Sequence, residues 1–182
     1  GRSNLYEYYK ERTVSWGDFI AQLEQEGVLR PKAVGVFMAS DAHGVPAMVR
    51  HQAERIRAVP SVALLVTVRF ERVPYVRAED RIAEIADLGH GFQRVVARYG
   101  FMQHPAVPPV IEVAAKQLQL ATTLRDVTYY LGRESLVAGP GGRMGPLLET
   151  FFRTLVRNSL PATAYFQLPP EQVMEIGLQI DL

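Results

Sequence analysis

The stretch Arg81–Phe101 constrains the fold of this chain more than any other. Its sequence, RIAEIADLGHGFQRVVARYGF, alternates apolar and polar residues on both sides of Gly89-His90-Gly91. Alternation with a period of two around glycines is typical of a β-hairpin. Arg94 and Arg98 share one side of the second strand, which leaves them to solvent, a partner or a ligand. The apolar residues share the other side, which we expect to meet a core: Val95, Ala97, Tyr99 and Phe101.

Two apolar runs precede the hairpin, Ala33–Ala39 and Val62–Phe70. Nearly continuous apolar runs indicate strands that are covered on both faces. Between them, Pro46–Ile56 has the apolar spacing of a helix, so the three segments predict a βαβ unit. The sequence therefore predicts an α/β fold: a mixed sheet with a parallel βαβ start and an antiparallel hairpin, with helices on the sheet faces.

Other segments complete this outline. Ser15 has the character of an N-cap for a helix over Trp16–Gln25. We expect a proline-rich turn over His104–Pro109. Further helices are predicted over Val110–Leu118 and Pro146–Asn158, and further strands over Val127–Leu131 and, at a sheet edge, Val173–Leu182. We expect a single domain over residues 1–182, with a helical lead-in over 1–30 and an α/β core over 31–182.

The totals exclude several classes of protein. Twenty Lys and Arg stand against nineteen Asp and Glu, without the basic excess that is usual for a nucleic-acid binder. There are no cysteines, which removes disulfides and thiolate chemistry. No run approaches the ~20 apolar residues that span a bilayer. Since the chain starts at Gly1 without a methionine, we expect it to be a piece of a longer protein.

No constellation for catalysis or metal binding is evident. The four histidines, His43, His51, His90 and His104, lie far apart, and no pair has the spacing of a helical metal site. A G-x-S-x-G elbow is absent, and no serine is placed with a histidine and an acid. We therefore expect no enzyme activity and no metal.

Anion binding is the chemistry with candidate residues. Ser40, Asp41 and Gly44 join a strand to a helix, where open α/β sheets often hold phosphates, although an ordinary N-cap turn explains the same residues. Arg94, Arg98 and Arg133 would form an anion or diphosphate site if their guanidinium groups converged. Ion pairs with Glu84, Asp87 or Glu134 are the alternative for these arginines.

Several segments in order resemble the C-terminal region of the KUP/HAK/KT family of potassium uptake permeases. LGHGFQRVVARYGFM at Leu88–Met102 is the closest match, joined by Val107-Pro108. The other similar segments are Ala33–Ser40 with Gly44-Val45-Pro46, LLVTVRFERVPYV at Leu64–Val76, YYLGRESL at Tyr129–Leu136, FFRTLVRNS at Phe151–Ser159, and YFQLPPEQVMEIGLQIDL at Tyr165–Leu182. The family's membrane helices are not present in this chain.

The resemblance implies a module on the cytoplasmic face of the inner membrane, attached to the membrane domain of the same transporter chain. Potassium would be handled by that absent membrane part, together with protons. The module's own role would be regulation or assembly, with a nucleotide such as cyclic di-AMP or an adenine nucleotide as the expected ligand and a homodimer as the expected state. A purely structural dimerisation module without a ligand is the alternative.

Overall fold

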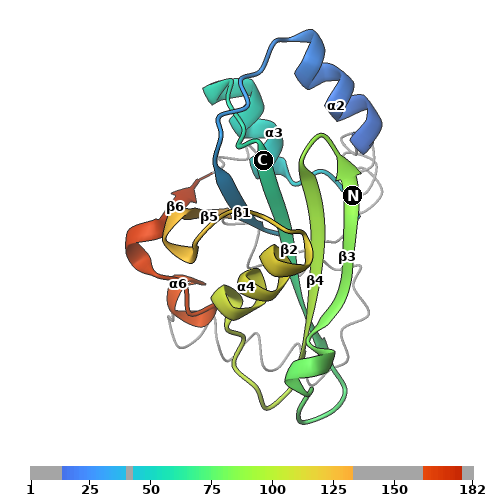
Figure 1. Cartoon of the computed structure of the whole chain (residues 1–182), viewed down its shortest axis with the longest axis vertical. Coiled ribbons are helices and arrows are strands. Elements are labelled where there is room, and N and C mark those ends of the chain that lie inside the picture. The colour runs from blue at the N-terminus through green and yellow to red at the C-terminus, as the bar shows by residue number, and fades with distance from the viewer. Residues whose placement is uncertain (1–13, 40–42, 133–161, 178–182) are drawn as a thin grey trace, which may run out of the picture.

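The computed structural model describes residues 14–39, 43–132 and 162–177. These ranges form a six-stranded sheet in the order β3-β4-β2-β1-β5-β6 (Figure 1). β3 runs antiparallel to β4, and every other neighbouring pair is parallel. The predicted mixed α/β sheet, with its βαβ start and its hairpin, is therefore confirmed. The strands are β1 (Val34–Met38), β2 (Val62–Glu71), β3 (Ile82–Gly89), β4 (Phe92–Gly100), β5 (Val127–Gly132) and β6 (Val173–Ile176).

Helices cover both faces of the sheet. They are α2 (Trp16–Gln25), α3 (Ala47–His51), α4 (Val107–Gln117) and α6 (Ala162–Tyr165). A π-helical turn, Gln52–Ile56, continues α3. Short 3₁₀ turns are formed by Ala78–Asp80, Leu124–Asp126 and Pro170–Gln172. In Figure 1, α4 lies in front of the sheet, and α2 and α3 lie toward one end of the long axis.

The face beneath α4 and α6 carries the larger apolar core. Every second residue of the central strands points into it, in the alternation that a pleated strand imposes. Its strand residues include Val36, Leu64, Val66, Val95, Ala97, Tyr99, Val127 and Tyr129, and its helix residues include Val107, Val110, Ile111, Ala114 and Tyr165. Val95, Ala97 and Tyr99, which the sequence predicted to face a core, therefore lie in this core.

The opposite face packs against α2 and α3. Its core contains Phe19 and Leu23 from α2, Met48, Val49 and Ala53 from the α3 segment, and Phe37, Ala63, Leu65, Phe92 and Tyr130 from the sheet. α2 has the predicted bounds, and the Ser15 hydroxyl caps it by accepting a hydrogen bond from the backbone N–H of Asp18 at 3.2 Å. Trp16 anchors the helix on the hairpin, with its ring 5.3 Å from that of Phe92.

The hairpin departs from strict alternation. A register shift lies between Ile82 and Glu84, so Ile82 and Ile85 both pack toward α4 although their spacing assigns them to opposite faces. A bulge adds one unpaired residue and reverses the faces beyond it, and apolar spacing alone does not reveal it. Phe101, predicted to face the core, instead lies one residue beyond β4 and is 42% exposed.

Two predicted boundaries were also wrong. α4 begins at Val107, inside the segment predicted to be a turn, and contains Pro108 and Pro109 in its first turn. Prolines are tolerated there because the first backbone N–H groups of a helix have no intrahelical acceptor. Pro46 is the N-cap of α3, not its first helical residue.

β6 lies at the sheet edge as predicted, and it ends at Ile176 in the described part of the chain. The predicted helix Pro146–Asn158 lies outside the described residues.

Gly91 offers a direct test of the hairpin. Its φ is +83°, and an added Cβ would collide with the carbonyl oxygen of Ser61. Gly91→Ala should therefore lower the free energy of unfolding by at least about 2 kcal/mol, measured by urea denaturation. Gly17→Ala in α2 is the matched control, because nothing lies within 4 Å of its added Cβ, and it should raise stability by ~0.5 kcal/mol. Equal effects of the two substitutions would contradict this hairpin geometry.

Tyr129 offers a second test, of the core. It is fully buried, and its hydroxyl has no hydrogen-bond partner in the described part of the chain. Burial raises the pKa of Tyr129 to about 12. The unfolded chain therefore loses this proton first as the pH rises above about 10, so stability should fall there. Tyr129→Phe should raise stability at neutral pH by about 1 kcal/mol and weaken the alkaline loss.

The matched control for this substitution is Tyr75→Phe, because the Tyr75 side chain is exposed. Tyr75→Phe should change neither the stability at neutral pH nor the loss of stability at alkaline pH, both measured from denaturation curves recorded between pH 7 and 11. An alkaline loss of the same size in Tyr129→Phe and in the unmodified chain would show that Tyr129 is not buried as described.

Candidate functional site

The strand order places a topological switch point between β1 and β5. Leaving the hairpin strand β3 aside, the parallel strands run β4-β2-β1-β5-β6. The chain moves outward from β1 to β2 and β4, and then returns to the other side of β1 to form β5 and β6. In open parallel sheets, ligands bind in the crevice at the carboxyl ends of the strands where this direction reverses. The carboxyl ends of β1 and β5 are therefore the candidate site.

The residues predicted from sequence to bind anions follow these two strand ends. Ser40 and Asp41 come directly after Ala39, and Arg133 comes directly after Gly132 at the end of β5; all three lie outside the described residues. Gly44 is described and half-buried, and a Cβ added to it would meet no atom of the described residues within 4 Å. Packing against the described residues therefore does not require a glycine at this position.

Arg94 lies elsewhere. It is on β4, which β2 and β1 separate from β5. Its Nε is 3.6 Å from a carboxylate oxygen of Glu84 on the neighbouring strand β3, and only 18% of its side chain is exposed. A cross-strand ion pair of this kind is the alternative that the sequence left open for this residue.

Arg98 has a structural contact as well. Its Nε and Nη2 donate to the backbone carbonyl oxygen of Asp80 at 3.2 and 2.9 Å, which ties β4 to the turn before β3. Because two strands lie between β4 and β5, the structure does not bring Arg94 and Arg98 to the strand end that Arg133 follows. The candidates therefore divide into two groups, and only the group around the switch point has the topology of a ligand site.

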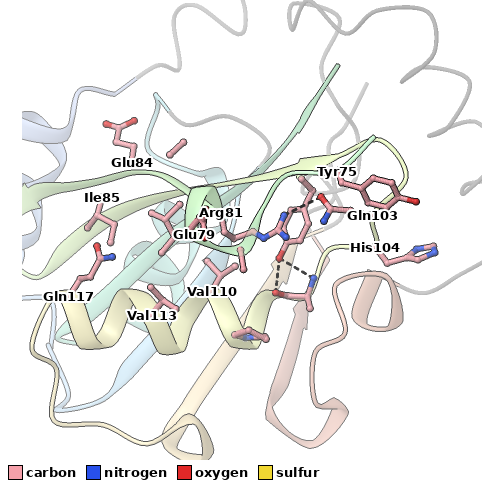
Figure 2. Close-up of a pocket in the computed structure, with 16 residues that line it drawn as sticks. Tyr75, Glu79, Arg81, Glu84, Ile85, Gln103, His104, Val110, Val113 and Gln117 are labelled. Carbon is pink, nitrogen blue, oxygen red and sulfur yellow. Dashed lines mark hydrogen bonds between the residues drawn. The ribbon is translucent and has the colours of Figure 1, made fainter. Parts of the chain in front are cut away.

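A second concave feature lies on the α4 face of the hairpin. It is a groove of about 790 Å³ between α4 and β3. Figure 2 shows Val110, Val113 and Gln117 facing it from α4, with Ile85 on the strand side and Arg81, Gln103 and His104 toward one end. Ile82, Ile85 and Val110 give it an apolar floor, while Glu79 and Glu84 place carboxylates on its lining.

Three polar residues of this groove, Arg81, Tyr99 and Gln103, contact one another or the backbone. The Arg81 guanidinium lies 3.9 Å from the centre of the Tyr99 ring. It donates to the carbonyl oxygens of Arg98 at 2.6 Å and Val76 at 3.1 Å. The Tyr99 hydroxyl donates to the carbonyl oxygen of Ala106 at 2.8 Å, and burial raises the pKa of Tyr99, so it stays neutral. Arg81 and Tyr99 therefore hold neighbouring loops together.

This polar network was not predicted from the sequence. Arg81 precedes β3 and Gln103 follows β4, so both resemble ordinary loop residues. Gln103 contacts Arg81 and Val76, which are 22 and 27 positions away in the sequence, so only the paired hairpin brings these residues together. The one available signal was Gly100, because a glycine within a strand often marks the close approach of another backbone segment.

Within residues 14–39, 43–132 and 162–177, no three His, Asp or Glu side chains come together as metal ligands. In the same ranges, no helix has both the length and the apolarity that a bilayer crossing requires.

Comparison with known proteins gives a consistent result. The chain is 36% identical over 181 residues to the "Probable potassium transport system protein Kup 1" of Syntrophobacter fumaroxidans, covering all of this chain and 27% of that protein. It is 34% identical to the "Probable potassium transport system protein Kup 2" of Chromobacterium violaceum, of which it covers 29%. The chain thus spans less than a third of the length of these relatives. No solved structure matches it.

The family model described as "K+ potassium transporter C-terminal domain" matches residues 32–182. This match begins just before β1 and includes every strand of the sheet. It confirms the family resemblance of the quoted segments. The chain belongs to the family of potassium transporter C-terminal domains that Kup proteins carry.

Proposed function

We propose that this chain is a non-catalytic regulatory module on the cytoplasmic face of a proton-coupled potassium transporter, and that it binds a nucleotide. Family membership and the Kup names of the relatives support the link to potassium transport. The module would be joined to the membrane domain of the same chain, because the relatives are more than three times longer than this sequence.

The switch point between β1 and β5 is the observation that carries the nucleotide proposal. A nucleotide there would meet residues from both strand ends. Arg133 would pair with a phosphate group, and the Ser40 hydroxyl would hydrogen-bond a phosphate oxygen. The Asp41 carboxylate would accept a hydrogen bond from a ribose hydroxyl. Gly44, which leaves open space beside it, would allow the close approach of the ligand.

Cyclic di-AMP is the first ligand to test, followed by ATP and AMP. Each should be added to the purified chain and the melting temperature recorded by differential scanning fluorimetry. A ligand at about one hundred times its Kd adds ~2.7 kcal/mol of stability, or roughly 5–10 °C for a domain of this size. No shift with any of the three would contradict nucleotide binding.

Two substitutions and one control locate the site. Arg133→Ala should reduce the ligand-induced shift, because a charged contact to phosphate contributes about 1.5–3 kcal/mol. Gly44→Leu should block the ligand while leaving the unliganded melting temperature almost unchanged, since its added Cβ meets no neighbour. Arg69→Ala is the matched control, because Arg69 is exposed and pairs with Glu71 on β2. A loss of the shift in the control alone would place the ligand elsewhere.

Assembly is the second candidate function, and one observation favours it. β6 is at the sheet edge, and Met174 on this strand is 50% exposed. An exposed edge strand can pair with the same strand of a second copy. Light scattering should then show a mass that rises from monomer to dimer with concentration, and Met174→Lys should shift this transition to higher concentration. A monomer at every concentration would exclude dimerisation through this chain.

A further inference from the structure

Four of the exposed large apolar residues lie together at one end of the molecule. They are Val73 and Tyr75 in the β2–β3 connection and Phe101 and Met102 just after β4, with exposed fractions of 45, 64, 42 and 59%. We call them the apolar tip. In Figure 1 these two connections lie at the end of the long axis opposite α2. Contiguous exposed apolar residues on a folded protein commonly mark a contact surface.

The apolar tip projects beyond the rest of the sheet. The last residue of β1, Met38, pairs with Val66, whereas β2 continues five residues further to Glu71 in register with Gly100 of β4. At ~3.3 Å per residue, the hairpin side of the sheet overhangs β1 by roughly 16 Å. The tip is therefore a protrusion at this end of the sheet, and Tyr75 also lines the groove beside α4.

The two connections are held rigidly. The backbone N–H groups of Phe101 and Met102 donate to the carbonyl oxygens of Val73 and Pro74 at 2.9 and 3.1 Å. The Gln103 side-chain oxygen accepts from the N–H groups of Val76 and Gly100 at 2.8 and 2.7 Å.

Close backbone packing reinforces these bonds. An added Cβ on Gly100 would collide with the carbonyl oxygen of Pro74, so the two connections approach as closely as glycine permits. The apolar side chains are thus displayed in a fixed arrangement, and little ordering entropy is lost when the tip binds.

The charges around the tip identify the kind of surface it meets. The whole chain is nearly neutral, yet residues 69–81 and 98–104 contain five arginines and three acids. Arg72, beside Val73, is exposed and makes no ion pair with any residue in the described ranges. A protruding apolar tip with the exposed Arg72 beside it is complementary to a bilayer surface with anionic headgroups, which takes up aromatic side chains at its boundary.

We propose that the apolar tip inserts into the interface of an anionic lipid bilayer. Tyr75, Phe101 and Met102 would enter the boundary between headgroups and acyl chains, and Arg72 would contact lipid phosphates. This interaction is separate from the proposed nucleotide site, and it would fix how the module lies against the membrane.

Tryptophan fluorescence tests the insertion, because Trp16 is the one tryptophan of the chain. The double variant Trp16→Phe/Tyr75→Trp moves the probe to the tip. Vesicles that mix phosphatidylcholine with phosphatidylglycerol should shift its emission to shorter wavelength, and pure phosphatidylcholine should give a smaller shift. The matched control is Trp16→Phe/Leu29→Trp, because Leu29 is 69% exposed and follows α2 at the other end of the molecule. Its emission should not change.

Vesicle sedimentation gives a second readout with the natural tryptophan in place. Met102→Asp and Arg72→Glu should each lower partitioning onto the anionic vesicles about tenfold, and Leu29→Asp should not change it. The proposal is overturned if the chain does not sediment with anionic vesicles, or if Leu29→Asp weakens binding as much as Met102→Asp. It is equally overturned if the Tyr75→Trp probe shifts with protein concentration in the absence of vesicles, which would show that a second copy covers the tip.

Discussion

Burial of β1 on both faces is the constraint on which the rest of this structure depends. Val36 and Phe37 are adjacent in the strand and point to opposite faces, and both are fully buried. Burying such side chains contributes about 1.5–3 kcal/mol each, but only if helices cover both faces of the sheet. The ring of Phe37 stacks on that of Tyr130 at 4.5 Å, which fixes β5 beside β1. β1 pairs with β2 at one edge and with β5 at the other, and the switch point lies between β1 and β5.

The sequence was sufficient to predict features that depend on local pattern. Apolar runs located β1 and β2, alternation around Gly89 and Gly91 located the hairpin, and Ser15 located the start of α2. It could not predict the strand order, because the pairing of β1 with β5 depends on contacts between residues 93 positions apart, such as Val34 and Val127. It also missed the bulge after Ile82 and the helical start at Val107, where local rules have exceptions.

Part of the candidate site could likewise be predicted from the sequence, because local patterns reveal which residues follow a strand. Ser40, Asp41, Gly44 and Arg133 were selected as residues that follow strands, and the strand order now places the ends of those strands side by side. Arg94 and Arg98 were grouped with Arg133 because all three are arginines on or just after strands. Their contacts with Glu84 and with the Asp80 carbonyl oxygen show that such residues also hold a hairpin together. Spacing in the sequence does not distinguish these two uses of a guanidinium group.

We propose the carboxyl ends of β1 and β5 as the functional centre of the chain, and a crystal structure grown with cyclic di-AMP tests this most directly. The account predicts ligand density in the crevice between these two strand ends, within contact of Gly44 and of the residues that follow Gly132. Ligand density at the groove beside α4, or crystals grown with excess cyclic di-AMP that contain no bound nucleotide, would contradict it.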